Sequence, residues 1–260
     1  MDRPFYSITF GDKNSWDEWA LMPVREGKIE LVSPDVKTEY VEVAGAVSDL
    51  DMSEVLTGYP TYKNRSGSLK FRFYDNGVPV RTRYTKLKNY LHGRSMRAVV
   101  EDAPEYYYEG RFAVGKLEYA KQGNWADTEI SYNVKPYKLE LTSSVEDWLW
   151  DPFNFETGVI REYGNIFVLV GLEPKEFTII GSRKPTVPRF TVTKINEHDE
   201  YDEDAYIQME IMDTVYKLPY GKTTIFPQIV LLDEEYPITL MNVNQPYGLV
   251  LAIDMQGGSL

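Results

Sequence analysis

The sequence predicts a mainly β protein of two domains, the first of which carries one helix and a long hairpin arm. Short segments of alternating apolar and polar residues recur along the chain, separated by Gly, Pro, Asn and Asp, as is typical of antiparallel sheets. Residues 1–139 contain 20 Lys or Arg and 20 Asp or Glu, whereas residues 140–260 contain 8 and 20. Because the whole net charge of −12 lies in the second part, we predict domains at 1–139 and 140–260.

The first domain is expected to consist of strands and a single helix. Its opening alternation, Phe5–Phe10, is followed by a polar segment, Gly11–Asp17, that we interpret as a loop. The remaining strand candidates of this domain are Glu30–Val32, Val36–Val43, Leu69–Phe73, Met96–Val100, Tyr106–Val114, Leu117–Ala120 and Ile130–Val134.

The helix is predicted between Pro79 and Gly93, because proline in the first turn and glycine after the last turn are common helix boundaries. Arg81–Arg97 contains six Lys or Arg and no acid. This favours a solvated helix face or an ion-pairing interface over phosphate contacts. The apolar residues that recur with the helical period of about 3.6 residues are Val80, Tyr84, Leu87 and Leu91.

The hairpin arm is predicted at residues 41–65, VEVAGAVSDLDMSEVLTGYPTYKNR. Two β-rich limbs enclose a polar middle punctuated by glycine, with Asp49–Met52 expected at the tip. The apolar content is too low for both limbs to lie in a core, so we expect the arm to pack on a neighbouring copy of the chain. The expected interface residues are Asp49, Leu50, Asp51, Met52, Leu56, Tyr59, Tyr62, Asn64 and Arg65.

The second domain shows strand patterns only, with turn residues between them, which predicts an antiparallel β-sandwich. A segment with four large aromatic residues precedes it: Trp148, Trp150, Phe153 and Phe155. Such a cluster is more often core, or a wedge between domains, than a platform on which sugars stack. The strand candidates are Ile166–Gly171, Phe177–Gly181, Arg189–Ile195, Ala205–Met212, Thr214–Leu218, Gln228–Leu232, Ile238–Val243 and Leu249–Met255.

The residue types argue against an enzyme, a cofactor site and a metal site. The chain has no cysteine, which excludes disulfides, thiolate metal sites and cysteine nucleophiles. His92, beside Gly93, is interpreted as a capping or surface residue, and it lies too far along the chain from His198 for a convincing metal pair. The acidic run Glu197–Asp204 lacks the glycine of a typical calcium loop, so we expect a solvated loop there.

Charge and hydropathy also restrict the partners. No apolar run approaches the roughly 20 residues that span a bilayer, and the first ten residues do not resemble a signal peptide. We therefore expect a protein made in a reducing cytosol, without a membrane partner. The acidic second half disfavours nucleic-acid binding there, because it would repel phosphates.

Several short motifs occur in a characteristic order and spacing: VEVAGAVSDLDMSEVLTG, Tyr62-Lys63-Asn64-Arg65, Leu91-His92-Gly93-Arg94, Tyr106–Phe112, Pro136-Tyr137-Lys138 and Ile253–Leu260. Together they resemble the distal tail proteins of long non-contractile-tailed, siphovirus-type bacteriophages and related prophages. The resemblance covers nearly the whole chain and departs from the family at Val43-Ala44-Gly45, where a proline often precedes the glycine.

The resemblance implies an N-terminal ring-forming β-sandwich whose belt hairpin clasps the next subunit, and a C-terminal galectin-like β-sandwich. It implies a virion structural protein at the tail tip, made in the host bacterial cytoplasm. There it would form a homohexameric hub between the tail tube protein and tail-tip or tail-associated hub proteins. Receptor-binding or baseplate proteins of the host adsorption apparatus are further implied partners. The alternative hypothesis is a carbohydrate-binding, receptor-binding module, motivated by the sandwich and by Trp148 and Trp150.

Overall fold

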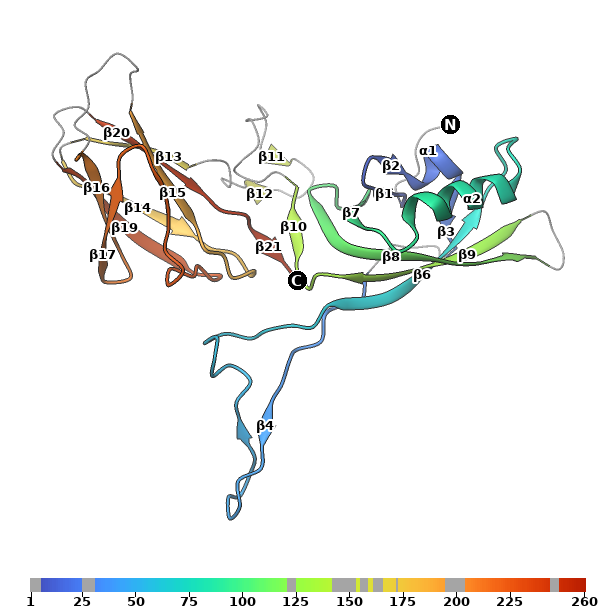
Figure 1. Cartoon of the computed structure of the whole chain (residues 1–260), viewed down its shortest axis with the longest axis horizontal. Coiled ribbons are helices and arrows are strands. Elements are labelled where there is room, and N and C mark those ends of the chain that lie inside the picture. Colours follow the sequence, from blue (N-terminus) through green and yellow to red (C-terminus); the bar gives the residue numbers. More distant parts are fainter. Residues whose placement is uncertain are drawn as a thin grey trace. The chain divides into compact units, whose positions relative to one another are not determined.

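The computed structural model describes residues 6–24, 31–120, 125–141, 153–154, 159–160, 166–171, 173–194, 204–243 and 248–260. Contacts divide the chain into two compact units, Met1–Leu139 with Leu260, and Glu140–Ser259. Half of the described residues lie in strands and 8% in helices, and the sheets are antiparallel (Figure 1). The prediction of a mainly β chain is thus confirmed.

The first unit is built on one antiparallel sheet with the strand order β2-β1-β7-β8-β9-β6-β3, and β10 pairs with β8. Along β6 and β9, buried residues alternate with exposed ones, so one face of the sheet meets the core and the other meets solvent. The strands are β1 (Ile8–Phe10), β2 (Lys13–Asn14), β3 (Leu21–Pro23), β6 (Arg65–Phe73), β7 (Ser95–Val100), β8 (Tyr106–Tyr119), β9 (Ala126–Val134) and β10 (Lys138–Glu140).

Strand β8 joins two segments that the sequence predicts as separate strands. Its register against β9 shifts between Val114 and Leu117, as in a β-bulge. Gly115 lies in this shift, where an added Cβ would come within 3.0 Å of the Glu129 carbonyl oxygen. The glycine that suggested a break therefore allows a close approach of two strands, and the strand continues.

The core of the first unit gathers side chains from both edges of the sheet and from the helices. Phe10 of β1 meets Phe112 of β8 edge to face, with ring centroids 5.1 Å apart, a favourable geometry for aromatic pairs. Other members come from β3, β6, β7 and β9 and from the inner face of the long helix. The largest fully buried members are Phe10, Trp19, Phe71, Phe73, Ile8, Leu21, Leu87, Leu91 and Ile130.

Two helices are present among the described residues, α1 (Ser15–Trp19) and α2 (Val80–Leu91). The expectation of a single helix and of a loop over Gly11–Asp17 is therefore corrected. The Asn14 side chain accepts the Trp16 N–H at 2.9 Å and begins α1, as is usual for an N-cap asparagine. A five-residue helix is too short to show a 3.6-residue period, which is why the pattern did not reveal it.

The long helix α2 lies where the sequence predicts it. Pro79 is the N-cap residue and His92 the C-cap residue, and Gly93 follows with φ +76°, a conformation that favours glycine. Arg83, 2% exposed, points inward and donates to the carbonyl oxygens of Trp19 and Tyr74 at 2.8 and 2.6 Å. These bonds tie α2 to the end of α1 and to the end of β6.

The second unit contains two four-stranded antiparallel sheets, β13-β20-β15-β18 and β14-β19-β16-β17. Alternate residues of β15, β16, β19 and β20 enter one shared core, so the predicted antiparallel sandwich is confirmed. Its strands are β13 (Ile166–Val170), β14 (Lys175–Ile180), β15 (Arg189–Lys194), β16 (Tyr206–Ile211), β17 (Thr214–Pro219), β18 (Thr223–Ile225), β19 (Glu235–Val243) and β20 (Leu249–Asp254).

One predicted strand of this unit, Gln228–Leu232, is wrong. It contains only an isolated bridge from Leu231 to Thr186, although Ile229 and Leu231 are fully buried. The alternating apolar residues of this segment pack into the core without forming a strand. The fourth strand of the sheet β13-β20-β15-β18 is β18, a segment for which the sequence predicts no strand. Three further short strands of this unit are β11 (Phe153–Asn154), β12 (Val159–Ile160) and β21 (Gly258–Ser259).

Candidate interaction arm

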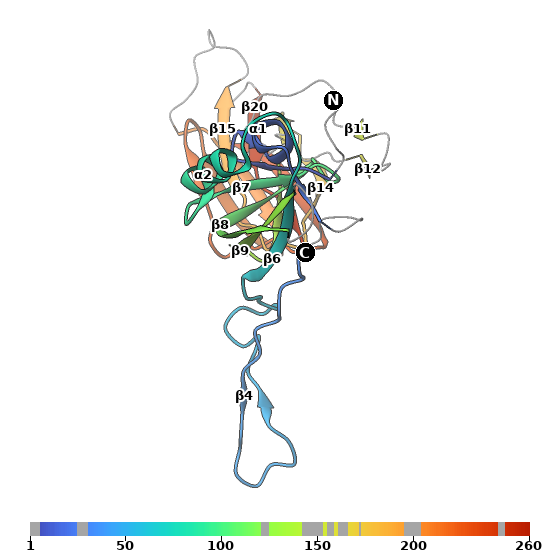
Figure 2. The same cartoon turned by 90° about the vertical axis from the view of Figure 1, so that its right-hand side faces the viewer.

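Residues 32–64 form an arm that leaves the sheet ahead of β6 and returns to it, extending away from the rest of the first unit (Figures 1 and 2). Its strand ladder is short: β4 (Tyr40–Val41) pairs with β5 (Leu50–Asp51). Further bonds join the limbs closer to the sheet, from the Lys37 N–H to the Thr61 carbonyl and from the Lys63 N–H to the Asp35 carbonyl, both 2.8 Å. The arm is thus a hairpin held together along most of its length.

The arm begins earlier than the sequence predicts, and its tip lies elsewhere. Val36 bridges to Tyr62, so the outgoing limb starts well before residue 41. The chain reverses around Gly45, which has φ +85°, and the segment Asp49–Met52, expected at the tip, belongs to the returning limb. The chain reverses at Gly45 because glycine adopts a positive φ at little energetic cost.

The arm exposes an unusual amount of apolar surface. Val47 and Leu56 are 107% and 97% exposed, and neither has core neighbours. Isolated exposed apolar residues are common, but a group of them on one projecting segment marks an interaction site. The exposed large apolar residues of the arm are Val32, Val36, Tyr40, Val41, Val43, Val47, Leu50, Val55 and Leu56.

The base of the arm is fixed by a buried arginine. Arg65, at the start of β6, is 4% exposed, and its Nε donates to the Pro136 carbonyl at 2.7 Å. Its Nη1 lies 3.5 Å and 3.4 Å from the carbonyl oxygens of Leu31 and Val32, where the outgoing limb begins. The guanidinium therefore holds both limbs against the end of β9.

Tyr132 of β9 also supports the base of the arm. Its hydroxyl accepts the Val32 N–H at 3.0 Å, and its ring lies across Gly67 of β6, its partner in the register. A Cβ on Gly67 would meet the Tyr132 Oη at 2.6 Å and the Cζ at 2.9 Å. The ring can reach the arm only because the residue beneath it is glycine.

Two more side-chain pairs join the returning limb to the sheet. The Asn64 Nδ2 donates to the Asn133 Oδ1 at 2.8 Å, and the ring of Tyr62 packs edge to face on that of Tyr137, with centroids 5.8 Å apart. Together with Arg65, these contacts give the exposed arm a fixed base.

The structure divides the nine predicted interface residues into two groups. Asp49, Leu50, Asp51 and Leu56 are exposed on the outer arm, with Met52 and Tyr59 half-buried. Tyr62, Asn64 and Arg65 lie at the base instead, where their side chains contact their own sheet. Val47 and Val55 are also exposed on the arm but are not among the predicted interface residues. Apolar residues in a segment too polar for a core are the signal that could have identified them.

One hydrogen-bonded cluster stiffens the middle of the arm. The Asp51 carboxylate accepts the Ser53 N–H at 2.9 Å and also the Ser53 hydroxyl, which holds the pKa of Asp51 below its usual range. The Ser53 Oγ accepts the Glu39 N–H at 2.9 Å, so the cluster crosses from one limb to the other.

The sequence also draws attention to two histidines, an acidic run and an aromatic cluster. The His92 Nδ1 accepts the Val114 N–H at 3.1 Å, so this ring joins the end of α2 to β8. No group of three or more His, Asp or Glu side chains suited to a metal ion occurs in the described ranges. His198, residues 197–203, Trp148, Trp150 and Phe155 lie outside the described residues.

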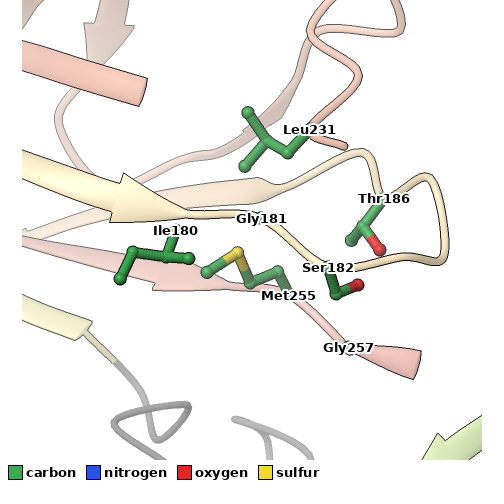
Figure 3. Close-up of a pocket in the computed structure, with 7 residues that line it drawn as sticks. All are labelled: Ile180, Gly181, Ser182, Thr186, Leu231, Met255 and Gly257. Atoms are coloured by element: carbon green, nitrogen blue, oxygen red, sulfur yellow. The ribbon is translucent and has the colours of Figure 1, made fainter. Parts of the chain in front are cut away.

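The second unit has a small hollow between the end of β14 and the end of β20 (Figure 3). The Ser182 and Thr186 hydroxyls both donate to the Lys184 carbonyl, at 3.0 and 3.1 Å, so they are engaged within the chain. No aromatic ring is among the lining residues, which makes the hollow a poor platform for a sugar. They are Ile180, Gly181, Ser182, Thr186, Leu231, Met255 and Gly257.

No helix among the described residues is long and apolar enough to cross a membrane.

No protein-family model matches the chain, and no curated protein matches it in sequence. Among solved structures, the fold is similar to the crystal structure of the Dit protein (gp 19.1) of phage SPP1, described as a paradigm of the hub adsorption apparatus in phages that infect Gram-positive bacteria. The match covers 98% of this chain and 99% of the SPP1 chain, with a TM-score of 0.58 and 11% identity. The chain therefore resembles that protein in fold over nearly its whole length.

Proposed function

We propose that this chain is a structural protein of a phage tail, in which copies assemble into a ring that serves as the hub of the adsorption apparatus. The observation that carries the proposal is the arm: an exposed apolar hairpin on a fixed base, with no core of its own to cover it. The likeness in fold to the SPP1 Dit protein over the full length supports the same role.

The assembly we propose is a homohexamer in which each arm grips the next copy. A head-to-tail contact repeated by rotation closes a ring, and a projecting arm provides such a contact. The tail tube protein, tail-tip or tail-associated hub proteins and receptor-binding or baseplate proteins are the proposed neighbours, and the virion tail tip is the proposed location. We further propose that the protein acts through its interfaces and catalyses no reaction.

Electron microscopy and mass photometry of the purified chain test this proposal. We expect a six-fold annulus whose population rises with protein concentration. A variant in which residues 37–61 are replaced by a short Gly-Ser turn should remain folded, because this deletion leaves Arg65, Tyr132 and the base contacts in place. It should not form rings. If the shortened variant forms rings as readily as the complete chain, the arm does not have the proposed role.

A further inference from the structure

The charges of the first unit divide between the arm and the rest of that unit. Residues 32–64 contain six acids and only two bases, Lys37 and Lys63, whereas the rest of residues 1–139 contains 18 bases and 14 acids. The acids of the arm are Asp35, Glu39, Glu42, Asp49, Asp51 and Glu54. The arm therefore carries a net charge of −4 beside a body of net charge +4.

Two acids lie near the outer end of the arm. Val41 pairs with Leu50 in the last rung of the ladder, and Glu42 and Asp49 are the next residues outward on the two limbs. Both are exposed, and no salt bridge involves either of them among the described residues. Like charges on the two limbs weaken a hairpin, and cations from outside would relieve that repulsion.

The outer face of α2 carries exposed basic residues instead of acids. Arg81 and Lys88, two turns apart and on one side of the helix, are exposed, as is Lys86. None of the three forms a salt bridge among the described residues, and residues 76–100 contain no acid. Tyr74 and Val78, both more than 40% exposed, precede the helix and add apolar surface at its first turn, where Arg81 lies.

This basic face is held in place before any partner arrives. The buried Arg83 guanidinium donates to the carbonyl oxygens of Trp19, Tyr74 and Val78, which fixes the helix and the loop that leads into it. A rigid receptor surface loses less freedom on binding than a mobile one.

An arm and a helix in the same copy are badly placed to meet. The arm is anchored at Arg65, where β6 begins, and α2 follows the end of β6 at Phe73, about 30 Å away at the usual rise of a strand. The arm also extends away from α2 (Figure 1). Contact between this arm and α2 would therefore require a second copy of the chain.

We infer that the basic side of α2 formed by Arg81 and Lys88 receives the acidic arm of a second copy of this chain. Glu42 and Asp49 pair with these cations, while exposed apolar residues of the arm cover Tyr74 and Val78. The inference rests on the proposed function and adds to it the surface that the arm occupies.

Charge reversal on each surface of the full-length chain tests the inference, with assembly followed by mass photometry over a range of concentrations. Arg81→Glu/Lys88→Glu and, separately, Glu42→Lys/Asp49→Lys should each raise the concentration for half-assembly roughly tenfold or more. A chain carrying all four substitutions should recover most of that loss, because the charges are exchanged rather than removed. Lys116→Glu/Lys222→Glu, on exposed positions elsewhere, is the matched control and should assemble normally.

The outcomes separate the two proposals. If the chain without residues 37–61 assembles normally, the proposed use of the arm fails, and this inference fails with it. If that chain fails to assemble while Arg81→Glu/Lys88→Glu assembles normally, the arm is used but binds another surface, and only this inference is overturned. The inference is also overturned if the chain with all four substitutions assembles no better than the two double variants, provided that circular dichroism shows all variants folded.

Discussion

The Nε of Arg65 donates a hydrogen bond to the carbonyl oxygen of Pro136 at 2.7 Å, which joins the first residue of β6 to the segment just beyond β9. The same side chain approaches the carbonyls of Leu31 and Val32, and its guanidinium lies over the ring of Tyr108, 5.5 Å from the centroid. Burial lowers the pKa of Arg65, because the charge is desolvated. Carbonyl dipoles and an aromatic face thus stabilise a cation at the base of the arm.

Arg65→Lys should loosen this base and destabilise the first unit. A lysine ammonium is a compact point charge and cannot reproduce the planar fork of the guanidinium, so buried carbonyls would lose their donors. We expect the free energy of unfolding to fall by about 1–3 kcal/mol, measured by urea denaturation. Trypsin should also cleave the arm at Lys37 and Lys63 more rapidly.

Arg111→Lys is the matched control for this substitution. Arg111 is exposed on β8 and donates to the Gly93 carbonyl at 2.9 Å, so its replacement should change the free energy of unfolding by no more than about 0.5 kcal/mol. Equal losses for both variants would show that Arg65 does not anchor the arm as the geometry indicates.

Gly67→Ala should displace Tyr132 and weaken the start of the arm. The new Cβ would stand 2.6 Å from the Tyr132 Oη, and the ring, which is buried, would have to move away from the Val32 N–H. We expect a loss of about 1–3 kcal/mol in unfolding free energy, the usual range for overpacking. Faster hydrogen exchange at Val32 would locate the effect.

Gly171→Ala provides the comparison, since a Cβ there would meet nothing within 4 Å. It should be neutral or slightly stabilising, because alanine has less conformational freedom to lose than glycine. If Gly67→Ala were as well tolerated as Gly171→Ala, the close packing of Tyr132 on β6 would be incorrect.

Most of the fold follows from periodicity, and the exceptions have physical causes. The alternation in Leu69–Phe73 and the helical period from Val80 to Leu91 identify β6 and α2, because each buries one regular face in the core. The helix α1 could not be found in this way, since its five residues depend on the Asn14 cap and on a left-handed Ala20. The bulge in β8 depends on how closely β9 approaches Gly115, which no local pattern encodes.

The arm itself could be predicted from the sequence, but its detailed geometry could not. Apolar residues in a segment too polar for a core indicate an exposed hairpin. The roles of Arg65 and Asn64 depend on Pro136 and Asn133, about 70 residues away, so only the tertiary structure shows that they hold the base. The tip was misplaced because the Asp-rich segment and the Gly45 turn are equally plausible reversal points by composition.

Asp127 on β9 should make the stability of the first unit depend on acid. The Arg72 guanidinium donates to both carboxylate oxygens, at 2.8 and 3.1 Å, which lowers the pKa of Asp127. A carboxyl group whose pKa is lower in the folded state than in the unfolded state stabilises the fold above the unfolded value, about pH 4, and loses this effect as the pH falls through the folded value. Asp127→Asn should therefore cost about 0.5–1.5 kcal/mol near pH 7.

The difference in unfolding free energy between the wild type and Asp127→Asn should shrink steadily below about pH 4, because protonation then removes the carboxylate charge from the wild type as well. Urea denaturation at several pH values measures it. Glu176→Gln, at an exposed position of β14, is the control and should show little difference at any pH. A cost of Asp127→Asn that persisted unchanged at low pH would assign the effect to packing instead of charge.

Substitution of the two most exposed apolar residues of the arm should separate folding from assembly. Val47 and Leu56 contact no core, so Val47→Ser/Leu56→Ser should leave the free energy of unfolding of the monomer within about 0.5 kcal/mol of the wild type. The same variant should assemble less readily, because burial of these side chains against a neighbour supplies part of the association free energy. Ile180→Ser/Val215→Ser, at apolar positions of the second unit that are 54% and 56% exposed, is the control and should assemble like the wild type. Equal loss of assembly in both variants would point to a general effect of surface hydrophobicity and would remove the special role of the arm.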